Sequence, residues 1–357
     1  MFTQHKKRTT LLRSFFLFSL AGLFCFALLT GMAAGDDGTD NQDLEKTAAY
    51  HQGTGACSDT ARAAFLASKF EAKDDYWIAV GNCRNYSDPE TQQECLESAK
   101  EDYQEARELS RDQLAARLDI CDELGEAPYD PVIDPDNFVD FEKVLAKEET
   151  FEPNPYFPLV PGTTRIYIAV NGEGEKTERI KVEVLKETKE ILGVNCIVVR
   201  DRVWEFDEEG EKTLIEDTFD WYAQDVEGNV WYFGEIAKNY EEGELADLEG
   251  SWKAGTDDAK AGYLMLKNPV VDTLYRQEFA LGEAEDMGRV IEVPPASASM
   301  TVPGETYEDV LVTQDFTPIE PDVLEYKYYA PGVGLVLEEN YATGERVELK
   351  KVIAAEP

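Results

Sequence analysis

Histidine is almost absent from the chain. Only His5 and His51 occur in 357 residues, His5 beside a basic N-terminal run and His51 in a polar acidic stretch. Histidine is the usual base of Ser–His–Asp and Cys–His catalysis and a common metal ligand. The sequence therefore offers almost no material for these hydrolases or for His-ligated metal centres.

Several cofactor motifs are also missing. The chain contains no G-x-G-x-x-G, no phosphate-binding loop and no C-x-x-C-H, and no two cysteines are closer than 12 positions. Dinucleotide folds, covalent haem and zinc knuckles are therefore not expected. Paired carboxylates could still perform acid–base chemistry, but 73 acidic residues prevent the choice of one pair. An enzyme is not favoured.

Positive charge is scarce. Lysine and arginine total 34 against 73 acidic residues, which gives a net charge of −39. Nucleic acid is excluded as a partner and anionic membranes are disfavoured, because neutralising phosphate needs a basic face. A solvated surface suited to solubility or a saline habitat explains the acidity most simply. Binding of divalent cations and attraction to a basic partner remain as alternatives.

Long apolar runs are absent after residue 30. Residues 1–35 have the order of a secretory signal peptide: a basic head, the apolar run Ser14–Thr30, and small residues before Asp36. An uncleaved N-terminal anchor is the alternative, whereas the residues before Cys25 make a poor lipoprotein site. Residues 36–56 then form a flexible acidic spacer. The signal predicts a periplasmic or secreted protein with no membrane span in the mature chain.

Four cysteines predict a stapled helical hairpin at residues 57–125. The residue numbers of Cys57 and Cys121 add up to 178, and so do those of Cys83 and Cys95. Residues that face each other in two antiparallel helices share such a constant index sum. Small residues pair at the same sum. The disulfides Cys57–Cys121 and Cys83–Cys95 fit an oxidising compartment. Cys196 is left over in an apolar run and is expected to be a buried thiol.

The helix bounds follow from local signals. The first helix is expected over 58–80, where Gly81-Asn82 stops it. The second starts with a capping box between Ser87 and Glu90 and ends at Gly125. A second apolar stripe off the seam either docks on the following domain or forms a partner-binding face. This stripe consists of Leu66, Phe70 and Trp77.

A proline-rich connector follows at residues 126–161. Its proline density argues against regular helix or central strand, and Tyr156 and Phe157 are expected to fasten it to a neighbouring surface. Four aspartates resemble a calcium loop, but the twelve-position pattern is absent. No cofactor is expected, with calcium as the alternative. These aspartates are Asp130, Asp134, Asp136 and Asp140.

From residue 162 to 357 the hydrophobic period changes to two. Ile180, Val182 and Val184 alternate with charged residues, and turn signals recur at short intervals. The clearest hairpin joins 219–224 to 230–233. Ten to twelve strands predict an antiparallel β meander that closes into a half-barrel or barrel. The fold class is therefore α+β, with a disulfide-stapled helical hairpin before an antiparallel β domain.

Four stretches resemble a group of uncharacterised secreted bacterial proteins. They are residues 154–164 (NPYFPLVPGTT), 221–225 (WYAQD), 228–235 (GNVWYFGE) and 275–278 (YRQE). Those proteins have a similar cysteine-stapled hairpin before the β domain, and the likeness covers residues 57–353. The resemblance implies a β domain, by analogy a half-barrel like those of envelope lipid or lipoprotein carriers. It transfers no catalytic residue.

The most irregular part of the β domain is the best place for a ligand site, since arginine and aromatics beside carboxylates suit a pocket mouth. An ordinary strand and solvated turn are the alternative. The resulting hypothesis is a non-enzymatic secreted or envelope module that binds an apolar ligand or a protein partner. The alternatives are a carboxylate-dependent hydrolase and an acidic cation-binding protein. The candidate ligand-binding residues are Trp252, Tyr275, Arg276, Glu278, Glu283 and Glu285.

Overall fold

The computed structural model describes residues 54–295, 299–303 and 305–355. The described residues form two compact units. A helical unit contains residues up to 132 together with 316–324, and a sheet unit contains 133–315 together with 325 onward. The predicted signal peptide, and the spacer as far as residue 53, lie outside the described residues.

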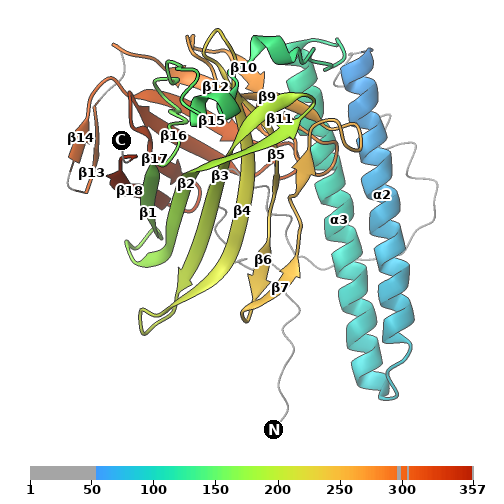
Figure 1. Cartoon of the computed structure of the whole chain (residues 1–357). Coiled ribbons are helices and arrows are strands. Elements are labelled where there is room, and N and C mark those ends of the chain that lie inside the picture. Colours follow the sequence, from blue (N-terminus) through green and yellow to red (C-terminus); the bar gives the residue numbers. More distant parts are fainter. Residues whose placement is uncertain (1–53, 296–298, 304, 356–357) are drawn as a thin grey trace. The chain divides into compact units, whose positions relative to one another are not determined.

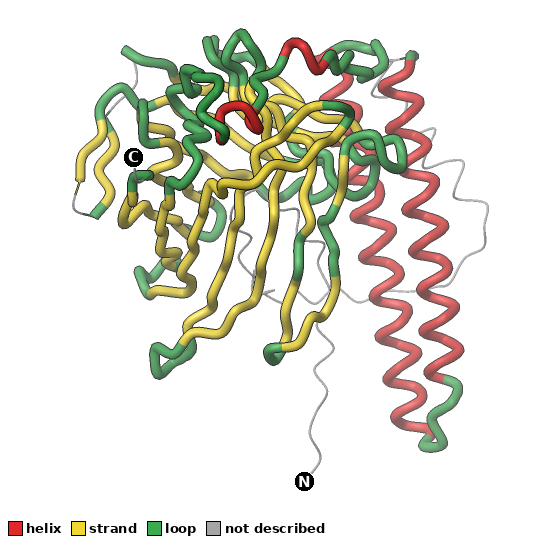
Figure 2. The backbone as a smooth tube through the Cα atoms, viewed as in Figure 1, coloured by secondary structure: helices red, strands yellow, loops and turns green. Residues whose placement is uncertain are grey.

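The helical unit is the predicted stapled hairpin. Helices α2 (Ala56–Cys83) and α3 (Pro89–Leu124) run antiparallel and are joined by one short turn (Figure 2). Both predicted disulfides are confirmed, with Cα–Cα distances of 5.7 Å for Cys57–Cys121 and 5.5 Å for Cys83–Cys95. Such bridges are typical of proteins from oxidising compartments.

The seam between the two helices buries few large side chains. Ala61, Phe65, Leu114 and Leu118 make a small buried cluster near the open end. Farther along, Tyr76 stacks on a ring of α3 at a centroid distance of 5.0 Å. Because the apolar cluster is small, the disulfides are expected to supply much of the stability of the helical unit.

Two predicted helix boundaries were wrong. Helix α2 continues through Gly81 to Cys83, since one helical glycine costs only about 1 kcal/mol and the disulfide holds the end in place. The cap of α3 is Asp88 rather than Ser87, because the Asp88 carboxylate accepts a 2.8 Å hydrogen bond from the Thr91 N–H. The predicted end at Leu124, followed by Gly125, is confirmed.

The connector contains two short helical turns that the proline count had argued against. They are the 3-10 turn η1 (Pro135–Asn137) and the helix α4 (Phe141–Leu145). Asp134 and Asp140 cap them by accepting backbone N–H bonds. The calcium-like spacing of these aspartates therefore coincides with two helix caps.

The sheet unit contains one antiparallel sheet of 16 strands that closes on itself and a separate two-stranded hairpin (Figure 1). The strands are β1 (Thr164–Val170), β2 (Lys176–Ile191), β3 (Val194–Phe206), β4 (Lys212–Gln224), β5 (Val230–Ile236), β6 (Asn239–Glu241), β7 (Glu244–Asp247), β8 (Trp252–Lys253), β9 (Lys260–Met265), β10 (Leu274–Arg276), β11 (Glu278–Phe279), β12 (Met287–Glu292), β13 (Met300–Val302), β14 (Glu305–Tyr307), β15 (Leu311–Phe316), β16 (Leu324–Ala330), β17 (Gly334–Asn340) and β18 (Glu345–Ile353).

Closure occurs at one nearly continuous strand. The sheet order is β10-β12-β15-β16-β17-β18-β1-β2-β3-β4-β5-β9-β11, and only Gln277 separates β10 from β11. β10 pairs with β12 and β11 with β9, so the segment 274–279 joins both ends of the order. The predicted α+β class with a barrel-like antiparallel sheet is confirmed. The strands outnumber the predicted ten to twelve because irregular segments split into short pieces.

The faces of the sheet follow from the register. Ile180 lies opposite Val203, and Val184 opposite Val199, and all four are buried. We call the face that carries them the inner face; the outer face carries the alternate residues, such as Arg179 and Lys181. Among the described residues, no helix combines the length and apolarity needed to cross a membrane.

Candidate functional site

A cavity lies on the inner face across β2 to β5. The centres of water molecules could occupy about 20 Å³ of this cavity, which is enough for one or two waters. Four of the nine lining side chains carry carboxyl groups and none is lysine or arginine. The lining residues are Phe157, Val182, Val199, Asp201, Glu216, Thr218, Asp220, Tyr222 and Glu235.

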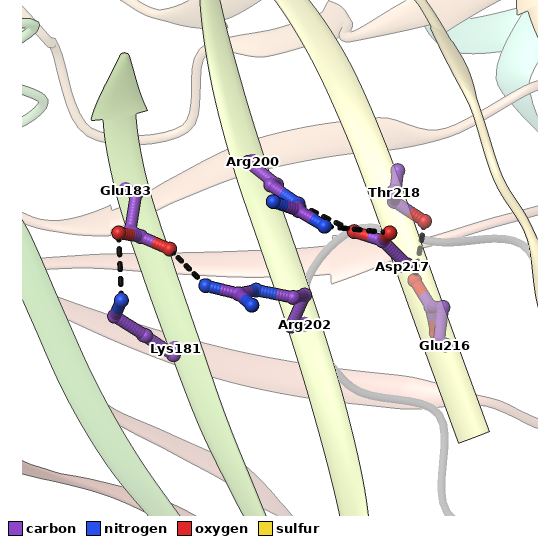
Figure 3. A network of polar contacts seen from close by, with 7 residues as sticks. All are labelled: Lys181, Glu183, Arg200, Arg202, Glu216, Asp217 and Thr218. Atoms are coloured by element: carbon purple, nitrogen blue, oxygen red, sulfur yellow. Dashed lines mark hydrogen bonds and ion pairs between the residues drawn. The ribbon is translucent and has the colours of Figure 1, made fainter. Parts of the chain in front are cut away.

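Strand β4 supplies most of the polar lining by simple alternation. Its inner side chains are Glu216, Thr218, Asp220 and Tyr222, and the Thr218 hydroxyl donates a 2.7 Å bond to Glu216. The residue between the first two, Asp217, instead points to the outer face. Figure 3 shows it paired with an arginine of β3, while Glu216 and Thr218 bond each other. Acidic side chains therefore occupy both faces of this strand.

A bulge in β5 brings a second carboxyl beside Asp220. Tyr232 lies opposite Tyr222 and Glu235 opposite Asp220, so β5 has one extra residue between the two pairs. Gly234 fills the bulge at φ 127°, and a Cβ there would lie 2.3 Å from the Trp252 carbonyl oxygen. Only glycine fits this position. Directly opposed residues have Cβ atoms about 5 Å apart, so two carboxyls meet on the cavity wall.

The carboxyls share a site that water barely reaches. Burial raises the pKa of Asp220 to about 7, even though the Tyr232 hydroxyl donates a 2.9 Å bond that lowers it. Burial likewise raises the pKa of Asp201 and of Glu235 well above the usual range, and neighbouring carboxyls raise both further. Clustering and burial together therefore oppose the ionisation of all three groups.

Two carboxyl oxygens on this wall have no hydrogen-bond partner among the described residues. They are Asp201 Oδ1 and Glu235 Oε2, from side chains that are 6% and 2% exposed. A buried acceptor without a donor is costly, about 1–3 kcal/mol. The two oxygens therefore mark a place where a donor from outside the chain would be stabilising.

Two of the six predicted ligand residues lie beside this cluster. Trp252 on β8 packs edge-on against Tyr232 at 5.2 Å. Glu278 on β11 is buried, and its carboxyl helps to raise the pKa of Glu235. These two residues therefore extend the cluster away from the cavity.

The other four predicted residues lie elsewhere. Tyr275 is buried on β10, and the Arg276 guanidinium sits over the Phe279 ring at 5.1 Å. Glu285 accepts a 2.8 Å bond from the Gly282 N–H and Glu283 is exposed in the same turn. Their ligand-binding role stays a prediction, but these four do not line the cavity.

Sequence reasoning missed the four cavity carboxyls. The alternation of Glu216, Thr218, Asp220 and Tyr222 was visible, but the intervening set contains Phe219 and Trp221. Apolarity alone would turn Phe219 and Trp221 inward, whereas the structure turns the acidic set inward. The usable signal was the predicted hairpin, which places Asp220 opposite Glu235. The register confirms that this hairpin joins β4 to β5.

Other predicted features have clear positions. Cys196 is a buried free thiol, as predicted, and burial raises its pKa. Leu66, Phe70 and Trp77 on α2 are 40%, 70% and 60% exposed, and their partner-docking role stays a prediction. Phe157 of the connector packs edge-on against Tyr222 at 5.3 Å, which confirms that it fastens the connector to the sheet. The described residues contain no group of three or more His, Cys, Asp or Glu side chains placed to hold a metal ion.

The buried carboxyls predict that the sheet unit loses stability as pH rises. A carboxyl with a raised folded-state pKa keeps its proton where the unfolded chain has lost it. For Asp220, the stabilising effect is complete below its ordinary pKa of 3.8. It is lost as the pH rises through the folded-state pKa of about 7. Each pH unit between those values contributes about 1.36 kcal/mol, so Asp220 alone accounts for at most about 4 kcal/mol.

Urea unfolding at pH 5 and pH 8, followed by tryptophan fluorescence, measures this effect. Four of the five tryptophans belong to the sheet unit, so the signal reports its unfolding. Asp220→Asn should reduce the pH dependence, while Glu227→Gln, at an exposed position of the same hairpin, should leave it unchanged. Stability that is equal or higher at pH 8 in the unmodified chain would contradict the prediction.

Comparison with known proteins gives two structural likenesses. No protein-family model and no curated protein matches the chain. A crystal structure of a "putative exported protein with YmcC-like fold" from Bacteroides fragilis matches with 13% identity and a TM-score of 0.31, over 56% of this chain and 100% of that one. A "putative lipoprotein" from Parabacteroides distasonis matches with 14% identity and a TM-score of 0.31, over 57% and 100%. Scores this low carry no conclusion about function.

Proposed function

We propose that the chain is an extracytoplasmic binding module whose curved sheet holds a small ligand by a positively charged amine group. The observation that carries the proposal is the pair of unpartnered oxygens, Asp201 Oδ1 and Glu235 Oε2, on a cavity with four carboxyls and no basic residue. A ligand N–H would supply the missing donors, and its charge would offset the clustered carboxylates.

Size and shape support a head group rather than a whole ligand. The cavity has room for one or two water molecules, which is enough for an ammonium group but not for a drug-sized molecule. Phe157 and Tyr222 on the wall add aromatic rings of the kind that attract cations. A ligand held only by apolar contacts has less support, because carboxyls dominate the lining.

The rest of the molecule is consistent with this role. The two disulfides fit an oxidising compartment outside the cytoplasm. The net charge of −39 would draw cations toward the protein and raise their local concentration. Binding of an ammonium ion also requires ionised carboxyls, so protons compete with the ligand and the affinity should rise between pH 5 and pH 8.

Methylammonium is the simplest probe of the proposal. At pH 8 methylammonium chloride should raise the thermal midpoint of the sheet unit above that in sodium chloride of equal ionic strength, and at pH 5 by less. Asp201→Asn and Glu235→Gln should each abolish the difference, because an amide group cannot replace the lost negative charge. Glu227→Gln removes an exposed charge of the same hairpin and should keep it. No difference at pH 8, or the same difference in all variants, would refute the proposal.

A carboxylate-dependent hydrolase is the second candidate. The direct opposition of Asp220 and Glu235, with raised pKa values, favours it, because glycosidases use two close carboxyls of unequal pKa. The small cavity argues against it, since a sugar ring needs more room. Turnover of glycoside substrates that disappears in Asp220→Asn would favour this candidate over the binding module. Calcium binding stays a prediction, for which a calcium-dependent thermal shift is the test.

A further inference from the structure

The outer face of β2, β3 and β4 concentrates cations around aromatic rings. We call it the cation–aromatic face. The Trp204 ring has three cations near it, from Arg179, Arg202 and Lys212, at 5.7, 5.4 and 5.2 Å from the centroid. The face consists of Arg179, Lys181 and Lys189 of β2, Arg200, Arg202 and Trp204 of β3, Lys212, Phe219 and Trp221 of β4, and Lys238 after β5.

The same arrangement repeats at the other two rings. Arg200 and Lys238 lie over Phe219 at 5.0 and 4.6 Å, and Lys189 lies over Trp221 at 5.9 Å. Such contacts attract the cations to the ring faces and restrict their motion. The face thus presents a fixed array of N–H donors.

Carboxylates neutralise only part of this array. Glu183 pairs with Lys181 and Arg202, and Asp217 makes a two-pronged pair with Arg200 at 2.7 and 2.8 Å (Figure 3). Within the part of the chain that the structure describes, the remaining four cations have ring neighbours but no carboxylate within ion-pair distance. The four are Arg179, Lys189, Lys212 and Lys238.

That shortage of carboxylates is unexpected in this chain. Acidic residues outnumber basic ones by more than two to one, so a cation on an average surface would find a carboxylate nearby. Acidic turns also limit the face. Residues 207–211 between β3 and β4, and residues 241–244 around the turn from β6 to β7, are mostly acidic. The face is therefore a local basic strip with acidic borders.

We infer that the cation–aromatic face is a docking surface for an acidic polypeptide. Arginine and aromatic residues are enriched in the cores of protein–protein interfaces and among the residues that dominate their binding energy. The unneutralised cations supply the charge complementarity, because carboxylate side chains of a partner would complete the pairs that this chain omits. The Debye length of about 8 Å in physiological salt lets the strip act locally despite the net charge.

Two other anionic partners fit the face less well. A lipid bilayer is wide and flat, so its anionic head groups would also meet the acidic turns at the borders. A sugar polymer would stack on open aromatic faces, whereas cations already lie over the rings of Trp204 and Phe219. A narrow polypeptide with carboxylate side chains avoids both conflicts.

A labelled peptide of twenty glutamates is the probe, measured by fluorescence anisotropy against the full chain. Binding should be detectable at low salt and should weaken steadily as salt rises. Lys212→Gln combined with Lys238→Gln should reduce the affinity about tenfold, because two exposed ion pairs with the partner are lost, and no carboxylate of this chain is left unpaired. The matched control, Lys100→Gln combined with Lys253→Gln, removes the same charge at exposed positions outside the face and should change the affinity less than twofold.

Competing classes are tested in the same assay with polygalacturonate and with phosphatidylglycerol vesicles. Preference for the glutamate peptide, lost in the Lys212/Lys238 variant and kept in the control, would support the inference. No binding at low salt, equal losses in both double variants, or tighter binding of the sugar polymer or the vesicles would overturn it. Unchanged thermal midpoints of both double variants show that any loss is not a loss of folding.

Discussion

Replacing Lys327 by methionine is expected to destabilise the sheet unit by about 3–5 kcal/mol. Lys327 on β16 is 3% exposed, and its ammonium lies 3.1 Å from Asp315 and 3.7 Å from both Glu325 and Glu338. Burial opposes its charge, but the three carboxylates more than compensate, so its pKa is raised. Without the ammonium, the buried carboxyls lose their main positive neighbour and must take up protons or repel each other.

Urea unfolding at pH 7, followed by tryptophan fluorescence, measures the loss. Lys350→Met is the matched control: that lysine also pairs with a carboxylate, at 2.7 Å, but its side chain is 28% exposed. Exposed pairs contribute about 0–1 kcal/mol, so the control should stay within that range. If Lys327→Met changes the free energy of unfolding by no more than the control does, the buried network does not stabilise the sheet unit.

Removing the outer disulfide should unfold the helical unit more readily than removing the inner one. The bridge Cys57–Cys121 spans a sequence separation of 64 and Cys83–Cys95 one of 12. Loop-closure entropy then gives about 4 kcal/mol for the outer bridge and about 3 for the inner one. Because the apolar seam of the hairpin is small, little else compensates for either loss.

Two double serine variants are compared, and each is the control for the other. They are Cys57→Ser/Cys121→Ser, which lacks the outer disulfide, and Cys83→Ser/Cys95→Ser, which lacks the inner one. Far-UV circular dichroism at 222 nm follows the helices, since the β sheet contributes weakly there. The outer variant should melt at the lower temperature, and the fluorescence transition of the sheet unit should stay in place in both. A lower melting temperature for the inner variant would show that loop length does not set the order.

The helical hairpin was predictable because its information is local and covalent. Cysteine spacing, small residues at a constant index sum and Gly125 all agree within about 70 residues of chain. Where the prediction failed, at Gly81 and Ser87, one weak signal competed with a neighbouring cap or disulfide. Boundaries of one or two residues depend on such small differences.

The candidate site was not predictable for a physical reason. Strand β4 carries acids and large side chains on both faces, so its alternation does not say which face turns inward. That choice depends on long-range pairing, in which Asp220 meets Glu235 only because Gly234 makes room beside Trp252. The outer face was unpredictable for the same reason. Its aromatic residues Phe219 and Trp221 are covered by cations rather than by apolar core side chains.

The pairing of the first strand of the sheet with the last has a consequence for how the protein is made. Neighbours in the sheet mostly follow each other in the chain, but β1 pairs with β18, whose last residue, Ile353, lies opposite Thr164. A chain that is synthesised from its N-terminus therefore presents β1 with one edge unpaired until nearly the whole unit has been made. Unpaired edges invite association with other chains. The pairing of β18 with β1 removes this unpaired edge.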